Sequence, residues 1–172
     1  MIELNNPDSI YSFQPIIDER SEILILGTIP GPESLRRRQY YANPNNQFWS
    51  IIYGVFEKTV METAYEAKVS FLLEHNIALW DVFYSARRNG ALDSDIENTE
   101  PNDISGLIRA YPRIKRLILG GRTAEKAYHK HFSDIAINAY YVPSASSAFA
   151  KKSIEEKIAD WKKAVFGAPP EQ

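Results

Sequence analysis

The sequence contains no cysteine, which excludes disulfide bonds, thiol nucleophiles, iron–sulfur clusters and cysteine-based zinc sites. Its three histidines and its acidic residues form no cluster with metal-ligand spacing. Neither a Walker phosphate-binding loop nor a GxSxG nucleophile elbow is present, so nucleophilic serine catalysis has no support. The sequence therefore predicts a protein that uses no metal and no other cofactor.

Long apolar runs are missing as well. No segment reaches the length of a membrane span, and residues 1–13 lack the basic and apolar parts of a secretory signal. A net charge of −2 gives no overall bias toward nucleic acid, although binding depends on where the charges lie. We therefore expect an intracellular, cytoplasmic protein without membrane contact, and we expect a monomer.

The overall amino-acid composition is that of an ordinary globular domain. The chain has 172 residues, of which 44% are hydrophobic and 24% are charged. A domain of this length buries enough surface to fold without a metal or a disulfide. We expect one domain over residues 1–166, followed by a frayed tail over residues 167–172.

Four short apolar runs, each bounded by turn residues, are typical of strands buried on both faces of a parallel sheet. They cover residues 23–26, 77–80, 116–119 and 139–142. Helical spacing of apolar residues occurs at residues 48–56, 65–73, 103–110, 123–131 and 153–166. The alternation predicts an α/β fold, a three-layer single domain with a four-stranded parallel sheet between helices.

In such a sheet, ligands bind beyond the carboxyl ends of the strands, so the segments that follow the four strands form the candidate site. The first segment, residues 27–49, is long for a connection, and its glycines permit tight turns and close approach of a ligand. A plain strand-to-helix connection is the alternative interpretation of it. The other segments begin at Asp81, Gly120 and Pro143.

Each of these segments carries cationic side chains, which a parallel sheet would bring to one edge of the molecule. Such a basic rim is the electrostatic footprint of a protein that binds the phosphate backbone. Ordinary solvated surface charges are the alternative interpretation. The expected rim consists of Arg36, Arg37, Arg38, Arg87, Arg88, Arg122, Lys151 and Lys152.

Aromatic and hydroxyl side chains lie in the same segments. Tyr40 and Tyr41 could stack on a base, although an isolated tyrosine more often packs in the core. Phe149 is a candidate wedge in DNA or a core residue. Serine side chains offer hydroxyl groups to a phosphate, and their small size lets the phosphate come close to the protein backbone. The serines in these segments are Ser144, Ser146 and Ser147.

A reaction that needs no strong base fits these residues. When an N-glycosidic bond breaks dissociatively, positive charge develops on the sugar and negative charge develops on the departing base. Backbone N–H groups aimed at the base would stabilise that charge, as an oxyanion hole does. An amide side chain could position the attacking water.

Two segments, GTIPGPESL at residues 27–35 and YYANPNNQFW at residues 40–49, resemble the first motif region of the uracil-DNA glycosylase superfamily. The resemblance is closest to the hypoxanthine-DNA (deoxyinosine) glycosylase branch. PSASSA at residues 143–148 resembles the second motif, and residues 78–82 and 116–121 stand where the family has its middle strands. The resemblance implies a four-stranded parallel sheet between helices, no metal, and a base flipped from DNA into a pocket.

The resemblance also implies roles for individual residues. Asn46 matches the asparagine associated with catalysis in the hypoxanthine branch and would position water; its place ahead of a helical pattern also makes it a candidate N-cap. Tyr41 would stack on the flipped base, and the serines would press on the DNA backbone. Apart from the resemblance, the place of Asp81 directly after a strand suits a carboxylate that orients the pocket, although an aspartate there more often caps a turn. The expected base pocket comprises Gly27, Thr28, Ile29, Pro30, Gly31, Tyr41, Asn43, Asp81 and Gly120.

The chain departs from the family pattern at four positions. Ile29 stands where mismatch-specific uracil glycosylases have a catalytic asparagine, and Asn43 stands where the hypoxanthine branch often has histidine. Gly120 replaces an asparagine that reads the base edge in other members, and Val142 replaces a histidine or asparagine. A pocket with fewer polar groups predicts weak activity on uracil or recognition through the backbone.

We therefore predict a monofunctional DNA glycosylase that acts in base excision repair. It would flip a deaminated base from DNA, hypoxanthine first and uracil second, and hydrolyse its N-glycosidic bond. Three alternatives stay open: a mismatch-specific uracil or thymine glycosylase, a catalytically weak nucleic-acid-binding module of the same fold, and a hydrolase of free nucleotides or nucleosides. The basic rim disfavours the last, because a free nucleoside needs no extended cationic surface.

Overall fold

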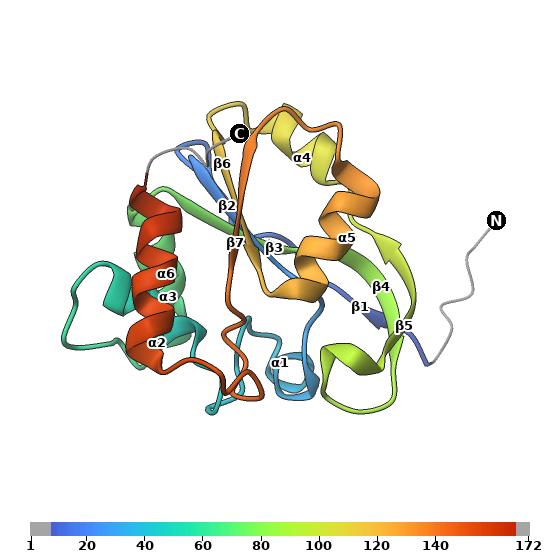
Figure 1. Ribbon diagram of the computed structural model, residues 1–172, viewed down its shortest axis with the longest axis horizontal. Coiled ribbons are helices and arrows are strands. Elements are labelled where there is room, and N and C mark those ends of the chain that lie inside the picture. Colours follow the sequence, from blue (N-terminus) through green and yellow to red (C-terminus); the bar gives the residue numbers. More distant parts are fainter. Residues whose placement is uncertain (1–7, 168–172) are drawn as a thin grey trace.

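The computed structural model describes residues 8–167 and contains the predicted four-stranded sheet (Figure 1). Its strands are β2 (Ile23–Gly27), β3 (Ile77–Asp81), β6 (Arg116–Gly120) and β7 (Asn138–Val142), in the order β3-β2-β6-β7. Every neighbouring pair in this sheet is parallel. The fold class predicted from the sequence is therefore confirmed.

Helices cover both faces of the sheet and give three layers (Figure 1). They are α2 (Phe48–Val55), α3 (Tyr65–Glu74), α4 (Ile104–Ala110), α5 (Arg122–Phe132) and α6 (Ile154–Phe166), each close to a predicted helical segment. Because successive strand residues point to opposite faces, Ile25 and Ile118 pack with residues of α2 and α6. Leu24 and Leu117 pack on the other face with residues of α4 and α5. All four of these side chains are fully buried or nearly so, which explains the continuous apolar runs.

The ends of two helices show how local sequence fixes local structure. A capping box opens α6: Ser153 Oγ accepts the N–H of Glu156 at 3.2 Å, and Glu156 Oε2 accepts the N–H of Ser153 at 3.0 Å. A short helix, α1 (Pro32–Arg37), lies inside the segment 27–49 that follows the first strand. The sequence did not predict this helix, because PESLRR has no apolar stripe. Gly167 caps the end of α6, and the rest of the expected tail, residues 168–172, lies outside the described residues.

A second, three-stranded sheet was not predicted from the sequence. It consists of β1 (Ile10–Tyr11), β4 (Phe83–Arg88) and β5 (Ile96–Pro101), which pair antiparallel in the order β1-β4-β5. The segment that begins at Asp81, which the sequence predicts as a loop after the second strand, is therefore mostly a strand: Asp81 ends β3, and Arg87 and Arg88 lie on β4. The β5 sequence IENTEP is polar and carries no apolar run, so it resembles a loop.

Asn102 fastens the second sheet to the end of β3. Its side chain is 5% exposed, and its Nδ2 donates to the backbone oxygens of Asp81 at 2.8 Å and Phe83 at 3.0 Å. Its backbone N–H donates to the oxygen of Val82 at 2.8 Å. The path of the chain directly after β3 thus depends on one buried amide.

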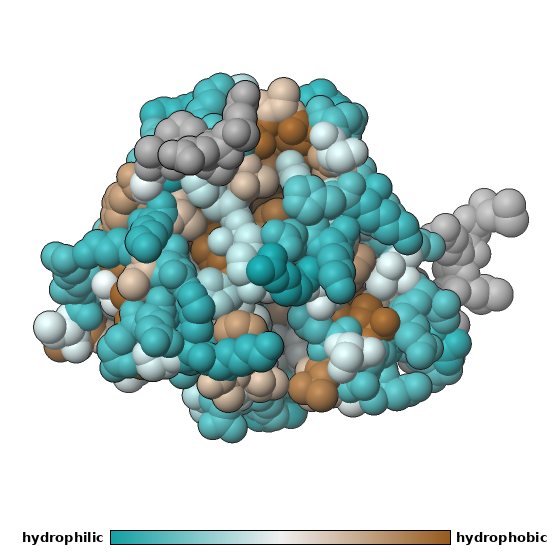
Figure 2. Space-filling view, viewed as in Figure 1, coloured by the Kyte–Doolittle hydropathy of each residue, from teal (hydrophilic) through white to brown (hydrophobic). Residues whose placement is uncertain are grey.

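The face of the molecule in Figure 2 is mostly hydrophilic, and its hydrophobic residues form small separate groups. Small groups of this kind are usual on the exposed surface of a globular protein. Within residues 8–167, no helix combines the length and the apolar character needed to cross a membrane.

Replacing Asn102 by alanine is expected to lower the free energy of unfolding by about 1–3 kcal/mol, because two buried carbonyl oxygens lose their donor. Urea denaturation followed by circular dichroism measures the change. Asn138→Ala is the matched control, since Asn138 is exposed at the start of β7. A loss no larger than that of the control would contradict the fastening role of Asn102.

Candidate active site

A cavity of about 150 Å³ opens at the carboxyl edge of the parallel sheet. The segments that follow β2, β3, β6 and β7 border it, and Figure 1 shows these connections at one end of the molecule. The expected pocket residues therefore meet in space, although their role in binding a base stays a prediction. The predicted residues that line the cavity are Gly27, Thr28, Ile29, Pro30, Gly31, Tyr41, Asn43, Asn46, Asp81, Arg88, Gly120, Ser144 and Ser146.

Asn46 lies on the cavity wall immediately before α2. Its Oδ1 accepts the N–H of Phe48 at 2.9 Å, and its own N–H donates to the oxygen of Asn43 at 2.9 Å. Through the first contact Asn46 satisfies the free N–H of Phe48 at the start of α2, but the N-cap position itself is Gln47, one residue later than the sequence predicts. The contact also fixes the amide in one orientation. Nδ2 has no hydrogen-bond partner among the described residues, so this side of the amide can hold a small polar molecule.

Tyr41 packs beside Gly27 at the end of β2. Its ring stacks on the ring of Phe48 with centroids 4.0 Å apart and an interplanar angle of 15°, so one ring face is covered. A Cβ at position 27 would lie 2.7 Å from Tyr41 Oη and 2.8 Å from Asp81 Oδ1, which is closer than such atoms pack. Only glycine therefore lets both side chains approach this point. Tyr41 itself has a φ of 53°, a left-handed conformation that is rare for a bulky residue.

Tyr40 belongs to the core. It is 5% exposed, and its Oη donates to the backbone oxygen of Gln14 at 2.9 Å. Its ring meets Phe13 edge-on, with centroids 5.3 Å apart. The structure thus favours the core interpretation of Tyr40 and leaves Tyr41 as the candidate that stacks on a base.

Asp81 is the most buried acidic residue of the cavity lining, with 4% of its surface exposed. Its carboxyl group accepts no hydrogen bond from the residues that the structure describes. The pKa of Asp81 is raised to about 7, mainly because the carboxyl is buried and to a smaller extent because the charge of Asp93 is nearby. A large fraction of this carboxyl is therefore protonated near neutral pH, when it can donate as well as accept.

Asp93 was missed in the sequence, although it lines the same cavity. It begins a short 3-10 helix, Asp93–Asp95, and its Oδ1 accepts the hydroxyl of Thr28 at 3.0 Å. Desolvation raises the pKa of Asp93, while the Thr28 hydrogen bond and the charge of Arg88 oppose the rise. Two carboxyl groups thus share the cavity, and their repulsion favours protonation of the more buried one, Asp81. The sequence around Asp93 is a polar connection without a distinguishing pattern, so no local signal marks Asp93 as a cavity residue.

The segment after β7 is joined to the segment before α2. The N–H of Gln47 donates to the oxygen of Ala145 at 2.9 Å. Lys157 of α6 is 1% exposed, and its Nζ donates to Gln47 Oε1 at 2.8 Å and to the oxygen of Ser146 at 3.3 Å. Burial lowers the pKa of this lysine. Sequence reasoning missed it because a lysine on an amphipathic helix is normally exposed.

The predicted serines and Phe149 occupy different places. Ser144 and Ser146 line the cavity, and Ser144 Oγ accepts the N–H of Ser146 at 3.1 Å. Ser147 is exposed beyond the cavity. Phe149 is half-buried, with its ring 5.4 Å from Nζ of Lys157. Contact of these residues with DNA stays a prediction.

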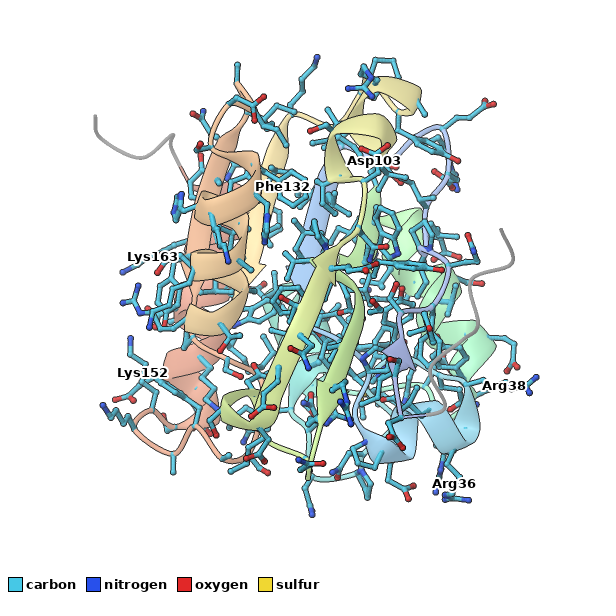
Figure 3. The ribbon with its side chains drawn as sticks, turned by 90° about the vertical axis from the view of Figure 1, so that its right-hand side faces the viewer. Arg36, Arg38, Asp103, Phe132, Lys152 and Lys163 are labelled. Carbon is cyan, nitrogen blue, oxygen red and sulfur yellow. The ribbon has the colours of Figure 1, made fainter. Side chains whose placement is uncertain are left out.

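Three residues of the expected basic rim, Arg36, Arg38 and Lys152, lie in the lower half of the view in Figure 3 and are spread across the molecule. Figure 3 places Arg36 and Lys152 far from Asp103 at the other end, and on opposite sides of the molecule. Most of the rim cations form exposed ion pairs, which contribute little stability. Arg38 and Lys151 have no ion-pair partner within residues 8–167. The paired cations are Arg36 and Arg37 with Glu33, Arg87 with Asp8, Arg122 with Glu125, and Lys152 with Asp160.

Comparisons with known proteins agree on one family. The family model of the uracil DNA glycosylase superfamily matches residues 14–165. A protein of Methanosarcina acetivorans named hypoxanthine DNA glycosylase is 37% identical over 154 residues, which cover 90% of this chain and 96% of the relative. A protein of the same name from Methanosarcina barkeri is 32% identical over 152 residues, which cover 88% and 95%. The solution structure of a candidate uracil DNA glycosylase from Methanosarcina acetivorans matches with a TM-score of 0.78 and 34% identity, over 91% of this chain and 96% of that one.

The raised pKa of Asp81 makes the stability of the fold depend on pH. The folded state holds this proton more tightly than the unfolded chain, whose carboxyl has the ordinary value of 3.8. The resulting stabilisation is complete below that value and is lost as pH rises through about 7. Because Asp81→Asn cannot ionise, its stability relative to the parent should rise by about 2–3 kcal/mol between pH 5 and pH 8.

Urea denaturation of parent and variant at both pH values measures this difference. Asp134→Asn is the control, because Asp134 is exposed. Equal pH responses of the two variants would show that Asp81 does not carry the effect.

Proposed function

The chain belongs to the uracil DNA glycosylase superfamily and is a DNA N-glycosylase, and we propose that its substrate is hypoxanthine in DNA. The position of Asn46 carries this proposal: its amide is fixed at a cavity wall, in the segment that resembles the hypoxanthine branch. The two relatives named hypoxanthine DNA glycosylase support it, since they match most of this chain. We further propose a monofunctional enzyme that removes deaminated bases in excision repair without a cofactor.

Hydrolysis adds one water molecule across the bond between C1′ of the deoxyribose and N9 of hypoxanthine. The electron pair of that bond leaves with the base, the water oxygen bonds to C1′, and a proton from the water ends on the base. Positive charge develops on the sugar early, so the position of the water matters more than its activation by a strong base. The Asn46 amide is the group proposed to hold this water beside C1′.

The target bond lies inside a stacked duplex, so the base has to flip outward to enter a recessed cavity. The Tyr41 face opposite Phe48 is proposed to stack on the flipped base. Backbone N–H groups of the non-proline residues within Gly27–Gly31 are proposed to stabilise negative charge on the departing base. The serines that line the cavity and the cationic rim would hold the DNA backbone.

Uracil is the second proposed substrate. Uracil and hypoxanthine both present a ring N–H beside a carbonyl oxygen, so groups that bind this edge of one base suit the other. Ile29 and Gly120 supply no amide side chain to the cavity, which favours slower cleavage of uracil. Incubation with oligonucleotides that contain deoxyinosine or deoxyuridine, followed by alkali, reveals abasic sites. Cleavage of neither substrate would overturn the proposal and favour a non-catalytic binding module.

Asn46→Ser is expected to lower single-turnover cleavage of deoxyinosine DNA by roughly 100-fold or more, by analogy with the loss of one preorganised polar group. Serine keeps an oxygen that can cap α2, so thermal stability should change little. Asn45→Ser is the control, because Asn45 is the exposed neighbour on the same turn. A serine variant that melts and cleaves like the parent would remove Asn46 from the mechanism.

Tyr41→Ala is expected to weaken binding of deoxyinosine DNA by about 1–3 kcal/mol, the range for stacking of a base on an aromatic ring. Fluorescence anisotropy with lesion-bearing and undamaged DNA measures the change. Tyr41→Phe keeps the ring and should bind like the parent. Equal losses on both DNAs would indicate that Tyr41 only packs against Phe48.

A further inference from the structure

A second hollow, a groove of about 810 Å³, lies beside β7, the edge strand of the parallel sheet. It shares no lining residue with the active-site cavity. Its volume falls within the range of about 300–1,000 Å³ that is usual for ligand sites. Tyr141 and Phe149 contribute aromatic rings to the groove. Its cationic side chains, the groove cations, are Arg122, Lys151, Lys152 and Lys163.

The groove is positively charged, although the whole chain has a net charge of −2. Among the described residues, Asp160 is the only acidic one in this lining, and it pairs with Lys152. Lys151 and Lys163 form no ion pair within residues 8–167. Figure 3 places Lys152 and Lys163 on the same side of the molecule. Positive charge gathered on one surface of a mildly acidic protein indicates an anionic partner.

Arg122 and Tyr141 lie against each other in the groove. The guanidinium carbon of Arg122 is 3.6 Å from the centroid of the Tyr141 ring. Nη1 of Arg122 donates to Glu125 Oε1 at 2.7 Å, which holds the guanidinium in place. The Arg122 side chain is 63% exposed, so much of it stays accessible to a partner. Unpaired bases stack on aromatic rings and on guanidinium planes with little regard to sequence.

One segment, residues 143–152, separates the groove from the active-site cavity. Ser144 and Ser146 of this segment line the cavity, while Pro143 and Phe149 line the groove. A DNA strand with one nucleotide flipped into the cavity passes over this segment. The neighbouring nucleotides on that side of the lesion therefore arrive at the groove.

We propose that the groove binds the lesion-bearing strand as single-stranded DNA on one side of the flipped nucleotide. The groove cations bind its phosphates, and its bases stack on Arg122, Tyr141 and Phe149. The inference rests on the proposed function, which supplies the flipped nucleotide. A peptide that pairs with the edge strand β7 fits less well, because main-chain hydrogen bonds would hold it and need no cations.

Such binding favours extrusion of the damaged base. Flipping a nucleotide breaks its pairing and stacking, and contacts between the groove and unpaired neighbours offset part of that cost. The parent should therefore bind deoxyinosine DNA more tightly when the strand continues unpaired beside the lesion than when the duplex is blunt. Tyr141→Ala should reduce this difference.

Fluorescence anisotropy with an undamaged oligo(dT) of about 10 nucleotides tests the groove without the cleavage reaction. Tyr141→Ala is expected to weaken binding roughly tenfold, because the bases lose a stacking surface. Tyr141→Phe keeps the ring and should bind like the parent. Circular dichroism verifies that each variant is folded.

Salt titrations of the same binding test the groove cations. Lys163→Gln removes one phosphate contact and should flatten the slope of log affinity against log salt concentration by about 0.7. Lys130→Gln is the matched control and should keep the slope, because Lys130 is exposed on α5 outside the groove. Asp160→Asn releases Lys152 from its acidic partner and should bind oligo(dT) more tightly than the parent. A loss of folding cannot produce that gain.

Groove variants that all bind oligo(dT) like the parent would overturn the inference and favour a protein partner for β7, while the proposed function would stand. An Asp160→Asn variant that binds oligo(dT) more weakly than the parent would also overturn the inference. A parent that cleaves no deoxyinosine DNA, with Tyr141→Ala still weakened on oligo(dT), would overturn the proposed function and retain the groove as a site for single-stranded DNA.

Discussion

Parallel, in-register pairing of the four central strands determines the geometry of the site. Gly27 pairs with Asp81, and Gly120 pairs with Val142, so the strands end at nearly the same level. The segments that follow them consequently leave from one edge and close around one cavity. Tyr41 and Asn46 belong to the segment after β2, whereas Asp81 ends β3 much later in the chain, so the pairing of β2 with β3 is what brings the buried carboxyl to the same cavity.

The same pairing explains which features could be predicted. A strand covered on both faces must be apolar throughout, so residues 23–26 and 116–119 can be recognised as buried strands from the sequence alone. Once the strands are known, the rule that ligands bind at their carboxyl ends selects Gly27, Asp81 and Gly120. The position of Asn46 before a helical pattern indicated its capping contact, and the resemblance to a family added its proposed role.

Features that depend on contacts between distant residues escaped prediction. The second sheet has a polar edge strand, and Asp93 and Lys157 gain their surroundings from segments far along the chain. Tyr40 and Tyr41 are adjacent in sequence and both border the cavity, yet Tyr40 is almost fully buried in the core while Tyr41 stacks on Phe48. The left-handed backbone at Tyr41 turns the chain between them, and no local residue pattern encodes that turn.

Helix α6 supports the cavity from behind. Its Lys157 ties Gln47 to Ser146, and its Trp161 donates from Nε1 to the oxygen of Pro143 at 3.0 Å. A chain emerges from the ribosome with its N-terminus first, so the residues around Asn46 are synthesised long before α6. Until α6 docks, the segments before α2 and after β7 lack these ties. A nascent or truncated chain without α6 therefore carries the proposed catalytic residue Asn46 but lacks the hydrogen bonds that join the segments on either side of the cavity.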